Sequence, residues 1–125
     1  MNENELSYAI RGCIFNVYNN LGPGLLESAY QAALAHELFK KSLPFSVQVG
    51  LPMEYETVRM DIGYRIDLLV DNKVIIEIKS VENLLDVHHK QVITYLKLSG
   101  LKLGLLVNFN TDNITHSIFR KVNGL

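Results

Sequence analysis

Two short apolar stretches joined by a three-residue polar turn constrain the fold of this chain more than any other feature. Residues 64–70 and 74–78 are rich in Ile, Leu and Val, and Asp71-Asn72-Lys73 between them has the composition of a turn. A connection this short joins neighbouring antiparallel strands, and a strand as apolar as the second one is buried. The segment therefore predicts a β-hairpin inside a sheet.

Three charged side chains interrupt this apolar hairpin. Asp67 lies within the first strand, and Glu77 and Lys79 lie at the end of the second. Residues two apart in a strand point to the same face, so Glu77 and Lys79 share one. If the strands pair symmetrically about Asn72, Asp67 lies opposite Glu77. Two carboxylates and an ammonium group then converge at one place.

Charges among apolar residues are costly to bury unless something compensates for the lost hydration. Mg²⁺ can do so, because it binds one or two carboxylates, often a backbone carbonyl, and several waters. The predicted ligands are Asp67, Glu77 and the backbone carbonyl of Ile78. Lys79 would orient the attacking water or neutralise charge growing on a phosphate. An ordinary Glu–Lys pair on a solvated strand, with Asp67 nearby by chance, explains the same residues, and the pattern alone favours neither interpretation.

Helical periodicity surrounds the hairpin. Apolar residues recur at three- and four-residue steps from residue 6 to residue 21, and the Gly- and Pro-containing segment 19–24 then predicts a turn. A second helix is expected over residues 25–41 and a third over residues 86–99, which Gly100 would end. The residues expected on the inner side of the second helix are Leu26, Tyr30, Ala33, Leu34 and Leu38.

The remaining segments predict strands. They cover residues 45–49, 52–60, 64–70, 74–78, 101–108 and 114–122. The expected order is ααββββαββ, in one domain spanning residues 1–125. The fold class is α/β (α+β), with a central mixed sheet flanked by helices.

Charge and composition narrow the class of protein. The chain has 12 Lys and Arg against 13 acidic residues, which argues against coating nucleic acid by bulk attraction but allows a local basic rim. The residues that could form such a rim are Lys40, Lys41, Lys90, Lys97, Arg120 and Lys121. The lone Cys13, the acidic start of the chain and the lack of a long apolar run predict a cytoplasmic protein with no membrane association.

Several motifs together resemble a known family. Asp67 followed by Glu77-Ile78-Lys79 resembles the PD-(D/E)XK nuclease superfamily, although Arg65-Ile66 stands where the proline of the name would be. Gly24 to Tyr30, with Glu27 at its centre, looks like the signature of the GxxExxY proteins, a branch of that superfamily. Residues 64–67, 91–96 and 104–109 extend the similarity from Leu21 to Arg120.

This resemblance implies a restriction-endonuclease-like fold and a nuclease that uses Mg²⁺ or Mn²⁺, with DNA as the substrate. It also implies that Gln91 steadies the catalytic lysine or a phosphate, and that Tyr95 contacts the substrate backbone. Gln91 and Tyr95 are four residues apart and therefore share a helix face. A polar pair at the sheet edge is the alternative. Glu27 would approach the metal directly or through water, or it would simply stabilise the start of its helix.

Other polar residues have less certain roles. Arg65 would hold Glu27 or Asp67 in place, contact a phosphate, or form a structural ion pair. His88 matches a family position beside the site and would contact substrate or transfer a proton. The three other histidines are expected at the surface or in packing; they are His36, His89 and His116.

The expected function is metal-dependent hydrolysis of nucleic-acid phosphodiesters. The chain is short for this fold, so weak sequence specificity, or reliance on a homodimer or a partner protein, is expected. A catalytically silent module that binds nucleic acid or protein is the rival function. A phosphoesterase acting on small molecules is a third.

Overall fold

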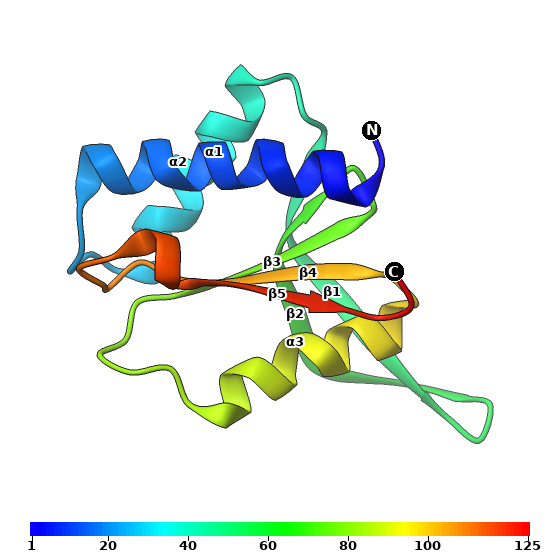
Figure 1. Cartoon of the computed structure of the whole chain (residues 1–125). Coiled ribbons are helices and arrows are strands. Elements are labelled where there is room, and N and C mark those ends of the chain that lie inside the picture. Colours follow the sequence, from blue (N-terminus) through cyan, green and yellow to red (C-terminus); the bar gives the residue numbers. More distant parts are fainter.

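A five-stranded sheet with helices on both faces forms the molecule, and the computed structural model describes residues 1–125. Two helices, α1 (Glu3–Leu21) and α2 (Glu27–Lys40), cover one face, and α3 (Asp86–Ser99) covers the other (Figure 1). The strands lie in chain order across the sheet. They are β1 (Phe45–Tyr55), β2 (Val58–Val70), β3 (Val74–Lys79), β4 (Leu103–Asn108) and β5 (Ile118–Val122), with a short 3-10 helix at Ile114–His116 before β5. The predicted fold class is confirmed.

The sheet is mixed because α3 crosses over between two of its strands. β3 and β4 run parallel, while the other neighbouring pairs are antiparallel. The register of β2 and β3 is the predicted one, symmetric about Asn72, with Val70 opposite Val74 and Leu68 opposite Ile76. Asp71 and Asn72 in the turn have φ values of 52° and 53°, a conformation that these two residue types tolerate better than most.

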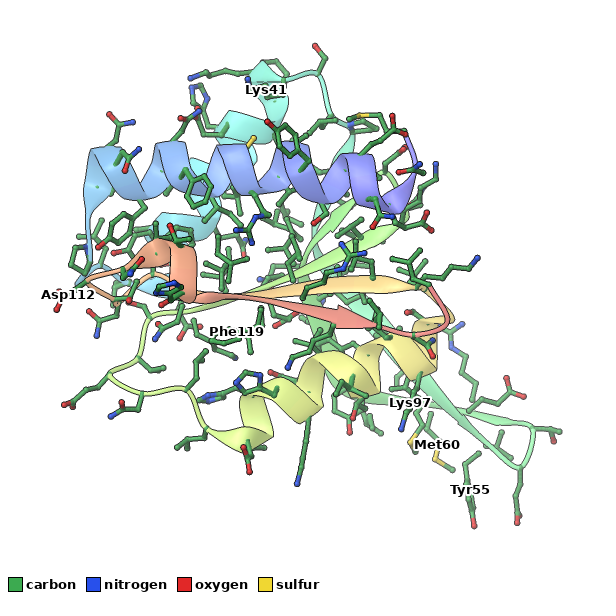
Figure 2. The ribbon with its side chains drawn as sticks, viewed as in Figure 1. Lys41, Tyr55, Met60, Lys97, Asp112 and Phe119 are labelled. Carbon is green, nitrogen blue, oxygen red and sulfur yellow. The ribbon has the colours of Figure 1, made fainter.

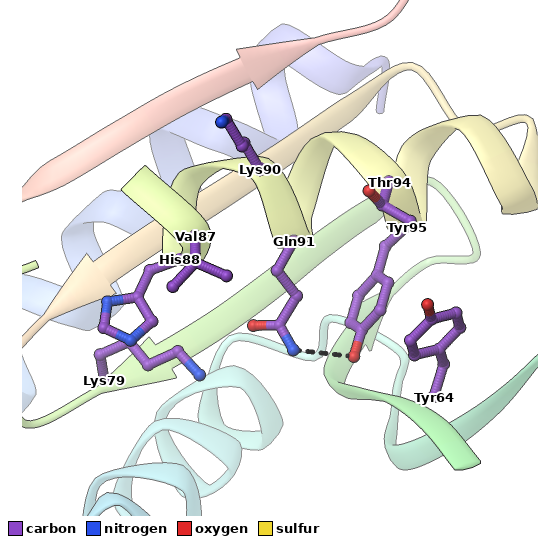
Figure 3. A pocket seen from close by; sticks show the side chains of 8 residues that line it. All are labelled: Tyr64, Lys79, Val87, His88, Lys90, Gln91, Thr94 and Tyr95. Carbon is purple, nitrogen blue, oxygen red and sulfur yellow. Dashed lines mark hydrogen bonds between the residues drawn. The ribbon is translucent and has the colours of Figure 1, made fainter. Parts of the chain in front are cut away.

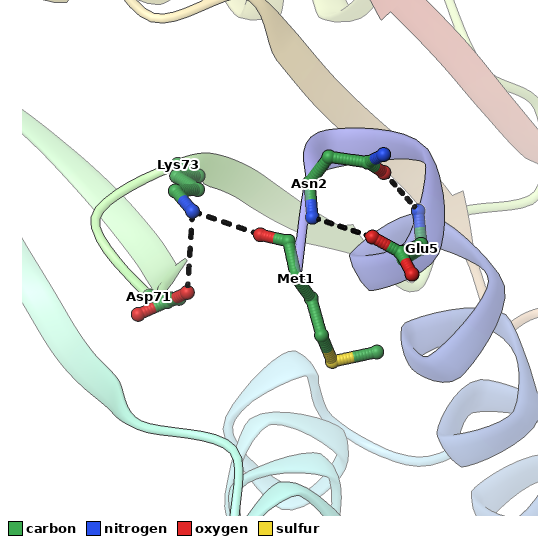
Figure 4. Close-up of polar contacts among 5 residues, drawn as sticks. All are labelled: Met1, Asn2, Glu5, Asp71 and Lys73. Atoms are coloured by element: carbon green, nitrogen blue, oxygen red, sulfur yellow. Dashed lines mark hydrogen bonds and ion pairs between the residues drawn. The ribbon is translucent and has the colours of Figure 1, made fainter.

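The first helix is tied to this turn. Asn2 and Glu5 form a reciprocal cap at the start of α1, each side chain accepting the other residue's backbone N–H. The Lys73 amine donates to the Met1 carbonyl at 2.8 Å and lies 3.7 Å from the Asp71 carboxylate (Figure 4). The start of the chain therefore anchors the closed end of the hairpin that carries the predicted site.

The strand prediction before the hairpin was wrong in one respect. Two separate strands were expected at residues 52–60 and 64–70, but β1 and β2 are long and continuous, and they turn at Glu56-Thr57. Three strands, not four, therefore precede α3. The turn lacks the Gly, Pro or Asn that usually marks one, and Pro52 is accommodated because β1 is an edge strand with a register shift there. The far end of this hairpin projects beyond the sheet and carries Tyr55 and Met60 (Figure 2).

Two smaller predictions also need correction. Leu26 was expected on the inner side of α2, but the helix begins at Glu27 and Leu26 is 76% exposed. Residues 114–122 were expected to form one strand, whereas residues 114–116 form the 3-10 helix. None of the three α-helices contains a stretch long and apolar enough to cross a membrane.

The interior is divided into two unequal apolar clusters. Twenty buried residues form the cluster between the sheet and the pair α1 and α2, whereas five form the cluster between the sheet and α3. The five are Leu51, Ile66, Ile75, Tyr95 and Leu96. Along β2, Leu68 belongs to the large cluster and Ile66 to the small one, so the strand changes its buried face next to Asp67.

Candidate active site

The backbone pairing of β2 and β3 ends where the predicted acids begin. Beyond the pair Leu68–Ile76, the carboxyl groups replace the ladder hydrogen bonds. The Ile78 N–H donates to Asp67 Oδ2 at 2.8 Å, and the Asp67 N–H donates to Glu77 Oε1 at 3.0 Å. Each carboxyl group is therefore fixed by the opposite strand, and the two acids meet in the opening between the strands.

Glu77 is the buried member of this pair. Glu77 is only 2% exposed. Burial first, and then the charge of Asp67, raises the pKa of Glu77 to about 8, although the charge of Lys79 opposes the shift. Without a cation, Glu77 therefore retains its proton at neutral pH. A bound divalent cation would favour the ionised carboxylate, so this pair has the chemistry of an incomplete cation site.

The backbone supplies a third oxygen to the same opening. In an extended strand, the N–H and C=O of one residue point to the same side. Because the Ile78 N–H points to Asp67, the Ile78 carbonyl also points toward β2, where the ladder has already ended. Two carboxylates and one carbonyl are a ligand set that Mg²⁺ or Mn²⁺ accepts, with water completing the shell.

Glu27 does not join this ligand set. No group of three or more His, Cys, Asp or Glu side chains lies close enough to hold a metal ion. Glu27 is exposed at the first residue of α2 and forms no ion pair. A role of Glu27 at the metal, direct or through water, stays a prediction.

Lys79 points into a cavity of about 420 Å³ between the sheet and α3 (Figure 3). The cavity is lined by Tyr64, Lys79, Val87, His88, Lys90, Gln91, Thr94 and Tyr95. No acidic side chain lines it, and Lys79 is not paired with an acid. An anionic ligand would therefore meet a free ammonium group there.

The predicted pair on α3 is joined by a hydrogen bond. Gln91 Nε2 donates to the Tyr95 hydroxyl at 3.1 Å, so in this structure Gln91 steadies the tyrosine (Figure 3). Burial and the charge of Glu77 raise the pKa of Tyr95, whose residue is 3% exposed. The phenol therefore keeps its proton and can still donate it at the edge of the cavity.

His88 lines the cavity, but Arg65 does not. The Leu85 N–H donates to His88 Nδ1 at 3.0 Å, so a neutral His88 carries its proton on Nε2. Arg65 forms no ion pair with Glu27 or Asp67, and its Nη1 donates to the Gln48 carbonyl at 3.3 Å. Arg65 therefore does not hold either acid in this structure.

The other histidines and the basic rim contribute little to this cavity. His89 packs edge-on against Phe119 at 4.9 Å, while His36 and His116 are exposed. Among the six proposed rim residues, only Lys90 lines the cavity. Lys40 pairs with Glu37 at 2.7 Å, and Arg120 donates to Asn4. A basic rim is therefore not gathered around the site.

Tyr30 in the Gly24–Tyr30 segment has a structural role. Its hydroxyl donates to the Gly22 carbonyl at 2.5 Å and accepts from the Leu25 N–H at 3.2 Å, and its ring stacks on Phe109. The Ser80 hydroxyl donates to the Leu25 carbonyl at 2.6 Å. These contacts hold the turn before α2 against the chain that leaves β3 directly after Lys79.

Three polar residues near the site were missed by the sequence analysis. Gln48 Nε2 donates to Gln31 Oε1 at 2.7 Å and to Asp67 Oδ1 at 3.3 Å. Asn108, buried at the end of β4, exchanges hydrogen bonds with the backbone of Val81 at 2.9 and 3.1 Å. Only the β1–β2 register could have indicated Gln48, because that register places it opposite Asp67.

Comparisons with known proteins identify the family and the fold of this chain. A family model described as the PD-(D/E)XK nuclease superfamily matches residues 4–121. A crystal structure of a protein named SSO0001 is similar to this chain, with a TM-score of 0.57 and 24% sequence identity. The match covers 98% of this chain and 60% of that one, and at this identity it shows the fold alone. A comparison with curated proteins gives no match.

Proposed function

The chain belongs to the PD-(D/E)XK nuclease superfamily, and we propose that it is a metal-dependent nuclease that hydrolyses phosphodiester bonds of nucleic acids, with DNA as its substrate. The observation that carries the proposal is the interlocked pair of Asp67 and Glu77, with Lys79 free in the adjacent cavity. A structural role alone would not require two acidic side chains without a cationic partner at the opening of a hairpin.

In this proposal, Asp67, Glu77 and the Ile78 carbonyl hold Mg²⁺ or Mn²⁺. When bound, the metal polarises a phosphoryl oxygen and lowers the pKa of a coordinated water. Glu77 loses its proton as the metal binds, because its carboxylate then has a cation to offset its burial. Asp67, oriented by the Ile78 N–H, keeps its oxygens directed at the same opening.

The cavity would hold the phosphate and its neighbouring nucleotide. The Lys79 amine orients the attacking water or neutralises charge that develops on the phosphate. The Tyr95 hydroxyl, held by Gln91, donates to a phosphate oxygen. His88 is placed to contact the substrate through Nε2, while Arg65 would contact the strand only outside the cavity.

Finer assignments belong to the same proposal. On the resemblance of its Gly24–Tyr30 segment we assign the chain to the GxxExxY branch, with Glu27 approaching the metal directly or through water. The protein acts in the cytoplasm with weak sequence specificity. The alternative to weak specificity of the chain alone is that it binds duplex DNA as a homodimer or with a partner protein.

The direct test is cleavage by wild type and Lys79→Ala. Each protein is incubated with supercoiled, linear and single-stranded DNA, in Mn²⁺ and in chelator. Wild type should cut only with the metal, and Lys79→Ala should be slower by about 100-fold or more. Lys102→Ala, an exposed lysine just before β4, is the matched control and should cut normally. If wild type and Lys79→Ala behave alike in every tube, the catalytic assignment is wrong and the silent binding module becomes the better account.

A further inference from the structure

Gln48 has an unusual backbone conformation in the middle of β1. Its φ is +50°, a left-handed value that costs free energy for any residue except glycine. The flanking residues pair normally with β2, Val47 with Leu68 and Val49 with Ile66, but Gln48 itself is skipped. The residue that it faces is therefore Asp67.

The Gln48 side chain connects Asp67 to α2. Its amide nitrogen has two hydrogens and donates to two acceptors, Gln31 Oε1 at 2.7 Å and Asp67 Oδ1 at 3.3 Å. The second oxygen of Asp67 accepts from Ile78 on the other side. The carboxyl group is thus held from β1 and from β3 at once.

The backbone conformation and the side chain require separate explanations. The left-handed residue allows β1 to change its buried face, since Phe45 packs on the large cluster whereas Val49 and Leu51 pack in the small one. Glycine would serve that purpose without strain. Gln48 is also exposed and packs in neither cluster, so core packing does not explain a glutamine. Its contact with Asp67 does.

We propose that Gln48, anchored by Gln31, is a positioning residue that fixes the Asp67 carboxylate for metal binding. This inference rests on the proposed function, because it assigns Gln48 a role only through Asp67. A neutral amide orients the carboxylate without adding a charge that would compete with the cation. The strained backbone at Gln48 then lowers the stability of the fold, but it is retained because the glutamine increases metal affinity.

A glycine substitution separates the cost of the strained backbone from the contribution of the amide to metal binding. Gln48→Gly removes both the strain and the amide, so its melting temperature in chelator should equal or exceed that of wild type. We call the Mn²⁺ concentration that gives half of the metal-induced rise in melting temperature the Mn²⁺ midpoint. This midpoint should increase about tenfold. Glu56→Gly is the matched control, because Glu56 also has a φ of 50° but lies at the turn of the projecting hairpin. Its Mn²⁺ midpoint should equal that of wild type.

Gln31→Ala tests the anchor. Its Mn²⁺ midpoint should increase less than that of Gln48→Gly, and the double variant should not exceed Gln48→Gly alone, because Gln31 acts through Gln48. A metal-free readout is the NMR signal of the Gln48 side-chain amide in chelator, which should shift in Asp67→Ala. No shift would mean that the hydrogen bond to Asp67 is absent, and the inference would be wrong.

The outcomes distinguish this inference from the proposed function. If wild type responds to Mn²⁺ and Gln48→Gly keeps the wild-type midpoint, Gln48 is not a positioning residue and the proposed function stands. If Gln48→Gly only lowers the melting temperature in chelator, Gln48 is structural and the inference is overturned. If wild type does not respond to Mn²⁺ at all, both the proposed function and this inference are wrong.

Discussion

The two faces of the sheet differ in what they contribute. The face under α1 and α2 has a cluster of twenty buried residues, nearly all aliphatic or aromatic. The face under α3 has a cluster of only five, together with the buried Glu77 and the cavity that Lys79 enters. The large cluster therefore provides most of the stability, while the smaller one leaves room for charged groups and for a ligand.

This difference leads to opposite expectations for substitutions on the two faces. Residues of the large cluster should affect stability and leave metal binding unchanged. Residues at the opening between β2 and β3 should affect metal binding and cleavage, and should change stability little or with the opposite sign, because a buried acid such as Glu77 is costly to ionise. The predictions below test this division, starting with the largest effect.

Asp67→Ala should give the largest loss of activity. Removing one of two carboxylate ligands should slow Mn²⁺-dependent DNA cleavage by about 1,000-fold or more and abolish the metal-induced rise in melting temperature. Asp61→Ala is the control, since Asp61 is an exposed acid on the same strand whose ion-pair partner is Arg59. An Asp67→Ala protein that cuts DNA at the wild-type rate would remove Asp67 from the site.

Leu34→Ala should give the largest loss of stability. Leu34 is fully buried in the large cluster, so its truncation should lower the free energy of unfolding by about 2–5 kcal/mol. Urea denaturation measures this loss. The Mn²⁺ midpoint of the protein that remains folded should not change. A changed midpoint would mean that the large cluster also sets the geometry of the metal site.

The stability of the metal-free protein should fall as the pH rises from about 5 to about 8. Burial raises the pKa of Glu77 from 4.5 to about 8 in the folded state, so the folded protein binds this proton more tightly than the unfolded chain does. The stabilisation is complete below pH 4.5 and is lost as the pH passes through 8, by about 3 kcal/mol. Urea denaturation in chelator at several pH values should show this slope in wild type. Glu77→Gln should lack it, and an equal slope in both proteins would refute the assignment.

Gly104→Ala should have a smaller effect, but it should lower both the stability and the cleavage rate. A Cβ at Gly104 would lie 2.6 Å from Val92 Cγ1, so the buried Val92 side chain, or α3 with it, must shift. We expect a loss of about 1–3 kcal/mol in stability and a slower cleavage rate, because Gln91 and Tyr95 lie on the same helix. Gly12→Ala, with no atom within 4 Å of the added Cβ, is the control. An unchanged cleavage rate in Gly104→Ala would show that the position of α3 is not critical.

The sequence predicted the centre of the molecule better than its edges. The register of β2 and β3 followed from a short polar turn between two apolar stretches, and this register brings Asp67 and Glu77 together. The continuous β1 was missed because the turn at Glu56-Thr57 carries no glycine, proline or asparagine. Gln48 was missed because its role depends on facing Asp67, nineteen residues away on β2, and on a backbone conformation that glutamine rarely adopts.

Roles on α3 were only partly predictable. Spacing placed Gln91 and Tyr95 on one face, but it did not show that Gln91 would donate to the Tyr95 hydroxyl rather than to the lysine or a phosphate. The role of Glu27 was inferred from the resemblance to the family. Its position at the start of α2 is set by the turn that Tyr30 holds. Both contacts are local in the sequence, but residue spacing shows only that the side chains are neighbours and not that they form hydrogen bonds.

The most direct measurement is the anomalous scattering of Mn²⁺ soaked into crystals of the wild-type protein and of Asp67→Ala. A wild-type peak about 2.0–2.3 Å from a carboxylate oxygen of Asp67, one of Glu77 and the Ile78 carbonyl, absent in the variant, is the predicted result. A map in which the opening between β2 and β3 stays empty at saturating Mn²⁺, or a peak bound only by other residues, would contradict the assignment of this opening as the metal site.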